Sequence, residues 1–216
     1  MAPDWRIWHE EYDHPHSALA NRLSVVQAQV RAALDQAADG PIRVLSLVAG
    51  QGRDLIPVLA DHPRRNDVAA RLVELDPRIA EVARQAAADA DLAGVEVVVG
   101  DAALVNHYEG LAPADLVLIC GLFGNITESD VAHTIDHTAS LTRRGGTVIW
   151  TRHRDEPDLV PRICEWFAEH GFALVWVSEP GAGYGVGVHR ARRDPPPLVP
   201  GARLFTFVGY DSLGAP

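Results

Sequence analysis

The chain has 216 residues, nearly half of them apolar, and it carries a formal net charge of −10. This length fits one α/β domain with a full-sized core. The acidic balance argues against nucleic acid as a partner, because proteins that bind phosphate backbones usually carry a basic face. No apolar run reaches the roughly 18 to 20 residues that span a bilayer, and no secretory signal is visible. We therefore expect a cytoplasmic protein without a membrane partner.

Residues 1–39 are expected to form an N-terminal segment that ends in a cap helix. Ser17 is a typical N-cap residue. The apolar residues behind it recur at helical spacing, and they are Leu19, Leu23, Val26, Val30 and Leu34. Gly40 and Pro41 are expected to end this helix. One face of the helix should therefore rest on the core.

Between residues 40 and 193, compact apolar runs alternate with helical patterns. The expected parallel strands cover residues 42–48, 70–75, 95–99, 115–120 and 147–151. Helices are expected over residues 54–59, from 76 onward, from 127 to about 142, and over 158–170. We expect Gly145 and Gly146 to end the helix that starts at 127. This alternation predicts a Rossmann-like, doubly wound α/β sheet.

The last two strands of the core are expected over residues 172–177 and 184–189. The glycine-rich link between them is too short for a parallel crossover, so they should form an antiparallel hairpin. Residues 194–216 follow as a proline-rich tail whose apolar stretch, 204–208, can pack back on the core. The sequence therefore predicts a cap segment (1–39), a core (40–193) and a tail (194–216).

A glycine-containing loop, residues 48–52, follows the first strand. In open α/β sheets, ligands bind at the carboxyl ends of the strands, close to the first one. Gly50 and Gly52 allow a sharp turn and a close approach of the backbone to a ligand. The third glycine of a dinucleotide motif is missing, and a tight turn without a ligand remains an alternative.

Two acids stand at the ends of the next two strands. Glu74 follows the loop by some twenty residues, where an acid can accept hydrogen bonds from both ribose hydroxyls. Asp101 ends the third strand, where it can accept a hydrogen bond from an adenine amino group. Each acid alone could instead cap a helix or face water. Together with the loop, they predict a nucleoside-containing cofactor.

These motifs resemble those of the class I S-adenosylmethionine-dependent methyltransferases over about residues 40–190. The matching stretches are residues 45–55, 73–77, 100–102, 114–121 and 141–147. The resemblance implies a seven-stranded, mostly parallel sheet with an antiparallel last strand, and S-adenosylmethionine as the cofactor. The cofactor-binding residues that it implies are Ala49, Gly50, Gly52, Asp54, Glu74, Leu75, Asp101, Ala102 and Cys120.

The chain departs from the family pattern at two positions. Ser46 stands where the family usually has an acid, and Val48 where it usually has the first glycine. We expect Arg53 and Asp54 to compensate, with Asp54 reaching the ammonium group of the cofactor.

The acceptor should lie beyond the fourth strand. The motif that accompanies methylation of a nucleobase or a glutamine amide is missing there, so we expect a small-molecule acceptor. Candidates for positioning it are Asn125, His153, Tyr12 and Tyr184, although each could have only a packing or surface role. The histidines and acids within residues 9–16 match no standard zinc spacing, so no metal is expected. The sequence is compatible with a monomer or a homodimer.

Three alternatives stay open. The same cofactor could serve an aminocarboxypropyl transfer or a cyclisation. The substitutions at Ser46 and Val48 would suit a non-catalytic binding module with the same fold. A nicotinamide oxidoreductase fits the glycine spacing and the terminal hairpin poorly.

Overall fold

The computed structural model describes residues 17–209 and residue 213. Within this part, seven strands form one sheet in the order β3-β2-β1-β4-β5-β7-β6. Neighbouring strands from β3 to β5 are parallel, whereas β7 lies antiparallel between β5 and β6. The predicted fold class is confirmed. The strands are β1 (Ile42–Ser46), β2 (Val68–Glu74), β3 (Val95–Val99), β4 (Ala114–Ile119), β5 (Thr142–His153), β6 (Phe172–Val177) and β7 (Tyr184–Ala191).

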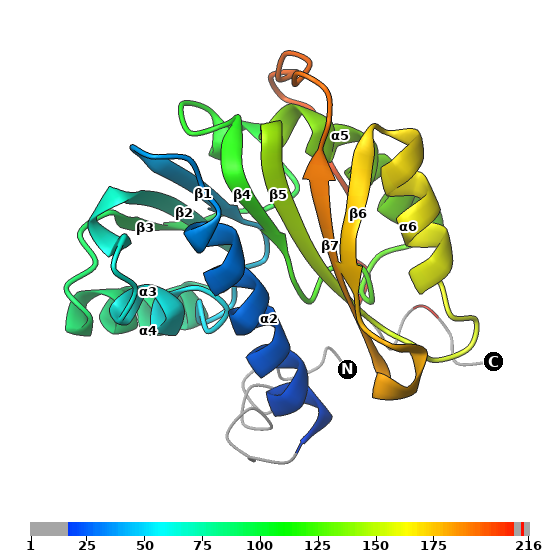
Figure 1. Cartoon of the computed structure of the whole chain (residues 1–216), viewed down its shortest axis with the longest axis horizontal. Helices are drawn as coiled ribbons and strands as arrows, with labels where there is room; N and C mark the ends of the chain where they lie inside the picture. Colours follow the sequence, from blue (N-terminus) through cyan, green and yellow to red (C-terminus); the bar gives the residue numbers. More distant parts are fainter. Residues whose placement is uncertain (1–16, 210–212, 214–216) are drawn as a thin grey trace.

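Helices cover both faces of the sheet (Figure 1). The cluster of apolar side chains on one face includes residues of α2, α3 and α4, and the cluster on the other includes residues of α5 and α6. None of the helices in the described part of the chain is long and apolar enough to cross a membrane. The α-helices are α2 (Ala18–Asp35), α3 (Ile56–Ala60), α4 (Pro77–Asp89), α5 (Glu128–Leu141) and α6 (Val160–Glu169), and the 3₁₀ turns are η2 (Arg65–Asp67), η3 (Val105–Tyr108) and η4 (Pro180–Ala182).

The caps of α2 and α4 follow from the sequence. The Ser17 hydroxyl accepts a hydrogen bond from the Ala20 amide at 3.0 Å, as expected of an N-cap. Asp76 caps α4 in the same way, and Pro77 occupies the first helical position. The cap helix is shorter than expected, since α2 ends at Asp35 and Gly40 lies in the turn that follows, with φ +98°.

The predicted extent of α5, to about residue 142, is confirmed, but the predicted role of Gly145 and Gly146 in ending it is wrong. The helix ends at Leu141 and β5 begins at once with Thr142, so that the strand is longer than predicted at both ends. Gly145 has φ +80°, and a Cβ atom on Gly146 would lie 2.9 Å from the Ala114 carbonyl oxygen. The two glycines therefore permit an irregularity inside the strand, where its pairing with β4 shifts register.

The chain after β7 leaves the sheet, turns back and returns along α5 (Figure 1). The Leu204 amide donates to the Ala103 carbonyl at 2.7 Å, and Arg203 forms a β-bridge with Leu104. The side chains of Leu204 and Phe205 are buried against the α5 side of the core. The end of the described chain is thus fixed beside the strand ends where ligands bind in such folds.

Candidate functional site

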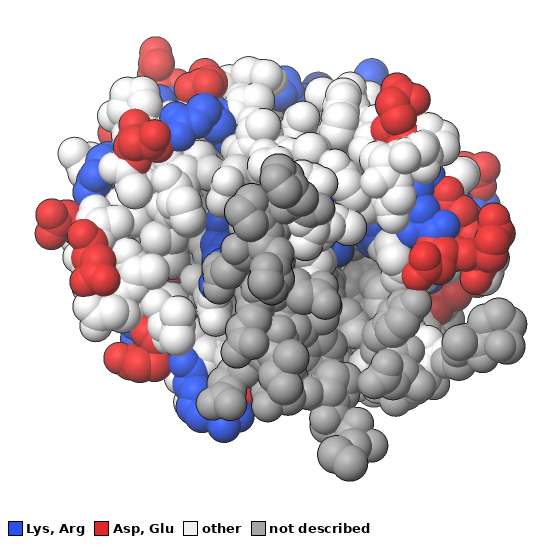
Figure 2. Space-filling view, turned by 90° about the horizontal axis from the view of Figure 1, so that it is seen from below, with Lys and Arg blue, Asp and Glu red and all other residues white. Residues whose placement is uncertain are grey.

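A cavity of about 640 Å³ opens at the edge of the sheet where the parallel strands end. Its walls come from the segments that follow β1 to β4, from α2 and from the returning tail. The volume lies within the range typical of small-molecule sites. Both acidic and basic residues line the cavity, among them Glu74, Asp101, Arg22 and Arg53. Figure 2 shows the molecule from below, with side chains of both charges around the edge of that face. The surroundings of the cavity are therefore neither uniformly acidic nor uniformly basic.

The loop after β1 makes the turn that the sequence predicts, despite the missing first glycine. Val48 has φ +46°, a left-handed conformation that a β-branched residue rarely adopts. Gly50 and Gly52 also have positive φ angles, of 56° and 69°. The Ala49 amide donates to the Val73 carbonyl at 2.9 Å, which fixes the loop to β2. The Val48 substitution therefore leaves the turn in place, at a cost of about 1–2 kcal/mol in backbone strain.

Gly52 is packed against its neighbours and does not form part of the cavity wall. It is buried and is not among the described residues that line the cavity. A Cβ atom on Gly52 would lie 2.5 Å from Ile56 Cδ1 and 2.9 Å from Leu72 Cδ2. The glycine thus lets the loop lie close against α3 and β2. The helix expected from Asp54 begins at Ile56, so Asp54 itself lies in the turn and lines the cavity.

The Glu74 carboxylate is held at the end of β2 by two backbone amides. Its Oε2 atom accepts from the Gly50 amide at 2.8 Å, and its Oε1 atom accepts from the Asp76 amide at 2.9 Å. Each oxygen keeps a lone pair that can accept a further hydrogen bond. Leu75, the next residue, lines the cavity with 68% of its surface exposed. A fixed acid therefore stands beside an apolar side chain that a ligand can cover.

Asp101 ends the turn after β3 and is tied to the tail. Its Oδ1 atom accepts from the Ala103 amide at 3.0 Å, and its Oδ2 atom accepts from the Arg203 guanidinium at 2.9 Å. Both Asp101 and Ala102 line the cavity. Sequence reasoning missed Arg203, because no motif links a tail residue to the end of the third strand.

Cys120 follows β4 and lines the cavity. Burial raises the pKa of the Cys120 thiol well above its usual value, and the neighbouring Asp54 carboxylate raises it further. The thiol is therefore protonated at neutral pH and is a poor nucleophile. Cys120 can shape the cavity wall but is not suited to covalent chemistry.

Four residues were predicted to position the acceptor. Within the described part of the chain, Asn125 is the one of them that lines the cavity. Its Nδ2 atom donates to the Gly121 carbonyl at 2.8 Å. Its backbone carbonyl accepts from the amides of Val208 and Gly209 at 3.0 and 3.1 Å. Asn125 therefore connects the segment after β4 to the end of the tail.

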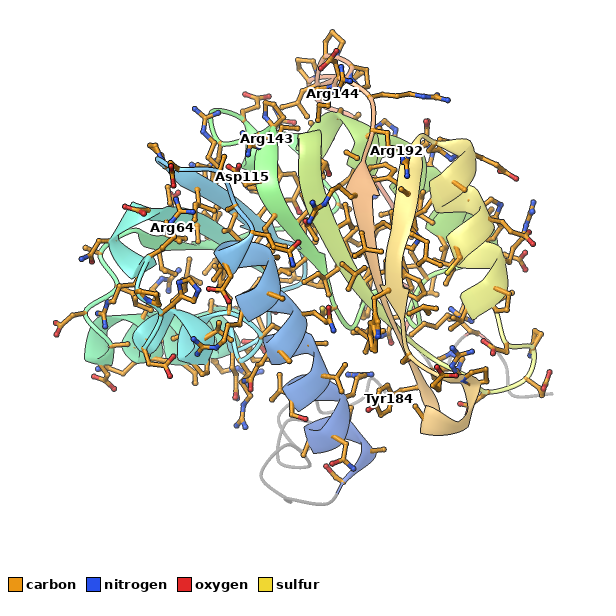
Figure 3. All side chains as sticks on the ribbon, in the orientation of Figure 1. Arg64, Asp115, Arg143, Arg144, Tyr184 and Arg192 are labelled. Atoms are coloured by element: carbon orange, nitrogen blue, oxygen red, sulfur yellow. The ribbon has the colours of Figure 1, made fainter. Side chains whose placement is uncertain are left out.

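His153 and Tyr184 lie opposite each other where β5 ends and β7 begins, and Figure 3 shows Tyr184 at that edge of the sheet. Neither is among the described residues that line the cavity. Burial lowers the pKa of His153, and the Arg152 charge lowers it further, so its imidazole is neutral at pH 7. Their catalytic roles stay predictions. Tyr12 lies outside the described residues.

Several lining residues escaped the sequence analysis. From α2 come Arg22, Leu23 and Val26, from the loops Gln51, Asp76 and Gly121, from α4 Pro77, Arg78 and Ile79, from β5 Thr151, and from the tail Phe205 and Phe207. Arg53, which was expected to compensate for the motif changes, lines the cavity as well. The Thr151 hydroxyl accepts from the Gly121 amide at 2.8 Å, which joins the ends of β4 and β5. Signals were present for three of these groups: the helical spacing on α2, the matched stretches 45–55, 73–77 and 114–121, and the apolar stretch of the tail.

Comparisons with solved structures agree with this geometry. An O-methyltransferase family protein from Burkholderia thailandensis aligns with a TM-score of 0.65 and 22% identity, over 88% of this chain and 61% of that one. The chain thus spans less than two thirds of that protein. Magnesium protoporphyrin IX methyltransferase from Synechocystis PCC 6803, with bound S-adenosylmethionine, aligns at 0.61 and 15% identity over 80% of each chain. The cyclase SpnF aligns at 0.57 and 13% identity, over 77% of this chain and 81% of its own.

A family model described as "Putative methyltransferase" matches residues 18–179, which is most of the chain. Among curated protein sequences, none is similar enough to match. The resemblance seen in the motifs is confirmed by the family model and by the fold. The chain belongs to this methyltransferase family and has the fold of the class I S-adenosylmethionine-dependent enzymes.

Proposed function

We propose that this protein transfers a methyl group from S-adenosylmethionine to a small molecule. One observation carries the proposal: the carboxylates of Glu74 and Asp101 line the same cavity as the loop after β1. Acids at the ends of two neighbouring strands can accept hydrogen bonds from ribose hydroxyls and an adenine amino group. The cavity is also large enough for the cofactor and part of an acceptor.

The residues fit the parts of the cofactor in order. Glu74 and Leu75 would hold the ribose and one face of the adenine, and Asp101 and Ala102 the adenine edge. The methionine part would lie along the loop, with the residues that line it there: Ala49, Gly50 and Asp54. The negative charge of Asp54 suits an ammonium group. Cys120 would then lie beside the sulfur, and we assign to Gly52 only the packing that shapes the loop.

The bound cofactor supplies a methyl group on a positively charged sulfur. The task of the protein is to hold the acceptor atom in line with that bond, because correct orientation accounts for much of the acceleration in such displacements. Asn125 lines the cavity on the acceptor side. His153, whose imidazole is neutral at pH 7, could take a proton from an acceptor hydroxyl if a bound acceptor reaches it.

The net charge of the chain and the walls of the cavity both favour a small acceptor. The chain has a formal net charge of −10, which opposes the binding of nucleic acid. The cavity is bounded by α2 on one side and by the tail on the other. Such walls suit a compact molecule better than a polymer.

Titration calorimetry with S-adenosylhomocysteine tests the cofactor assignment directly. We expect binding to the wild-type chain; a failure to bind would instead support a non-catalytic module. Product analysis tests the reaction, because methyl transfer yields S-adenosylhomocysteine, whereas aminocarboxypropyl transfer yields methylthioadenosine. Cyclisation is the second candidate, favoured by the structural likeness to the cyclase SpnF; it would give a rearranged substrate without consumption of the cofactor.

A further inference from the structure

The tail crosses the cavity from the adenine side to the acceptor side. At one end, Arg203 is paired with Asp101 at 2.9 Å. At the other end, the amides of Val208 and Gly209 donate to the carbonyl of Asn125 at 3.0 and 3.1 Å. Residues 203–209, which we call the tail segment, therefore connect the turn after β3 to the segment after β4.

The tail segment is also fixed along its length to α5. The His133 imidazole donates to the Arg203 carbonyl at 3.1 Å, and the Thr134 hydroxyl donates to the Leu204 carbonyl at 3.1 Å. The Thr206 amide lies 3.4 Å from the Asp130 carboxylate. Because backbone groups make these contacts, they set the path of the segment independently of its exposed side chains. The positions of those side chains follow from this path.

Two phenylalanines of the tail segment line the cavity, and they differ in exposure. Phe205 is only 3% exposed and belongs to the apolar core on the α5 side. Phe207 is 41% exposed and lies next to Val208, which bonds to Asn125. Phe205 therefore forms part of the core, whereas Phe207 presents apolar surface on the acceptor side.

The opposite wall also contributes apolar side chains. Leu23 and Val26 of α2 line the cavity, and Gly121 adds backbone without a side chain. Once the strand-end residues are assigned to the cofactor, the remaining lining includes aliphatic side chains of α2 on one side and the Phe207 ring on the other, with Arg22, Asn125 and Thr151 as polar neighbours. An aromatic side chain interacts most favourably with another flat ring, by offset stacking or edge-to-face contact.

We propose that Phe207 is a specificity-determining residue and that the acceptor carries a planar apolar ring system beside its methylated atom. This inference rests on the proposed function. It adds the tail segment to the active site and names a substrate class.

The test uses two probes of equal carbon skeleton, naphthol and its saturated analogue decahydronaphthol. Each is titrated into protein already loaded with S-adenosylhomocysteine, and binding is followed by saturation-transfer NMR. We expect naphthol to bind with a dissociation constant of about 1 mM or tighter, as a fragment of this size can. Decahydronaphthol should bind several-fold more weakly, because it cannot stack on the ring of Phe207.

Three variants then locate the site. Phe207→Ala should weaken naphthol binding about tenfold, and Phe207→Tyr, which keeps the ring, should weaken it less than about threefold. Val199→Ala is the matched control, since Val199 is an exposed apolar tail residue, at 58%, that does not line the cavity. It should leave naphthol affinity unchanged. Thermal unfolding of each variant shows whether it is folded.

The outcomes separate the two proposals. Unchanged naphthol affinity in Phe207→Ala, or equal affinity for both probes, overturns the assignment of Phe207 and leaves cofactor binding intact. A wild-type protein that binds S-adenosylhomocysteine but no naphthol overturns the substrate class alone. Absence of S-adenosylhomocysteine binding overturns the proposed function and this inference with it. If Phe207→Ala is unfolded, Phe207→Leu takes its place and should also weaken naphthol binding.

Discussion

Arg203 and Asp101, separated by about half of the chain, form an ion pair of 2.9 Å beside the cavity. The aspartate is the acid that the third motif contributes, and the arginine belongs to the tail that follows the last strand. The pair fixes the Asp101 carboxylate from outside the core. In the proposed cofactor site, where Asp101 binds the adenine, the position of the tail is thereby connected to adenine recognition.

Replacing Arg203 tests this connection. Arg203→Ala should lower the free energy of unfolding by less than about 1 kcal/mol, because both partners are partly exposed. It should nevertheless weaken S-adenosylhomocysteine binding severalfold in calorimetry, because Asp101 loses a contact that orients it. Arg144→Ala is the control, since Arg144 pairs with Asp194 near the start of the tail and at the opposite edge of the sheet (Figure 3). Equal effects of the two variants on affinity would contradict the connection.

Glu74→Ala should weaken S-adenosylhomocysteine binding by about 1–3 kcal/mol, the range expected for lost hydrogen bonds to a charged group. The variant also leaves the amides of Gly50 and Asp76 without their carboxylate partner. Glu96→Ala is the control, because Glu96 is an exposed acid that pairs with Arg71 outside the cavity. Calorimetry should show that Glu96→Ala keeps wild-type affinity, and a Glu74→Ala variant that also keeps it would refute the assigned ribose site.

The architecture was accessible from the sequence because its signals are local. Strands such as Val95–Val99 were predicted with their observed bounds, since a short apolar run between turns needs no knowledge of its partners. Glu74 and Asp101 were found because their place depends only on where a strand ends. The order of strands then brings both acids to one cavity.

The rest of the site depends on contacts between distant segments. Arg203 and Phe207 approach the cavity only because the tail returns along α5, and no periodicity predicts that path. The glycines at 145 and 146 were expected to end a helix, but they lie inside β5, where the register shift with β4 decides their role. Val48 was seen as a departure from the motif, and only the backbone shows that it keeps the left-handed turn.

Comparison of Gly52 with Gly110 separates the energetic cost of backbone strain from the cost of a steric clash. Both have positive φ, of 69° and 80°, but a Cβ atom on Gly52 would lie 2.5 Å from Ile56, whereas one on Gly110 would meet no atom within 4 Å. Gly110→Ala should therefore cost about 1–2 kcal/mol of stability, and Gly52→Ala a further 1–3 kcal/mol. Urea denaturation measures both. Equal losses would mean that the loop can shift to accommodate the methyl group and that Gly52 has no special packing role.

His189 should make the fold sensitive to acid. Its side chain is buried, its Nδ1 atom accepts from the Trp150 indole at 3.1 Å, and Nε2 has no hydrogen-bond partner among the described residues. Burial lowers the pKa of His189 from 6.5 to about 4. The unfolded chain therefore binds a proton at this residue between pH 6.5 and 4 and the folded chain does not, so stability is full above pH 6.5 and falls by about 3 kcal/mol as the pH drops through this window. His189→Asn, whose amide oxygen can still accept from Trp150, should lose this part of the pH dependence in denaturation curves; a variant that keeps it would assign the acid sensitivity to other groups.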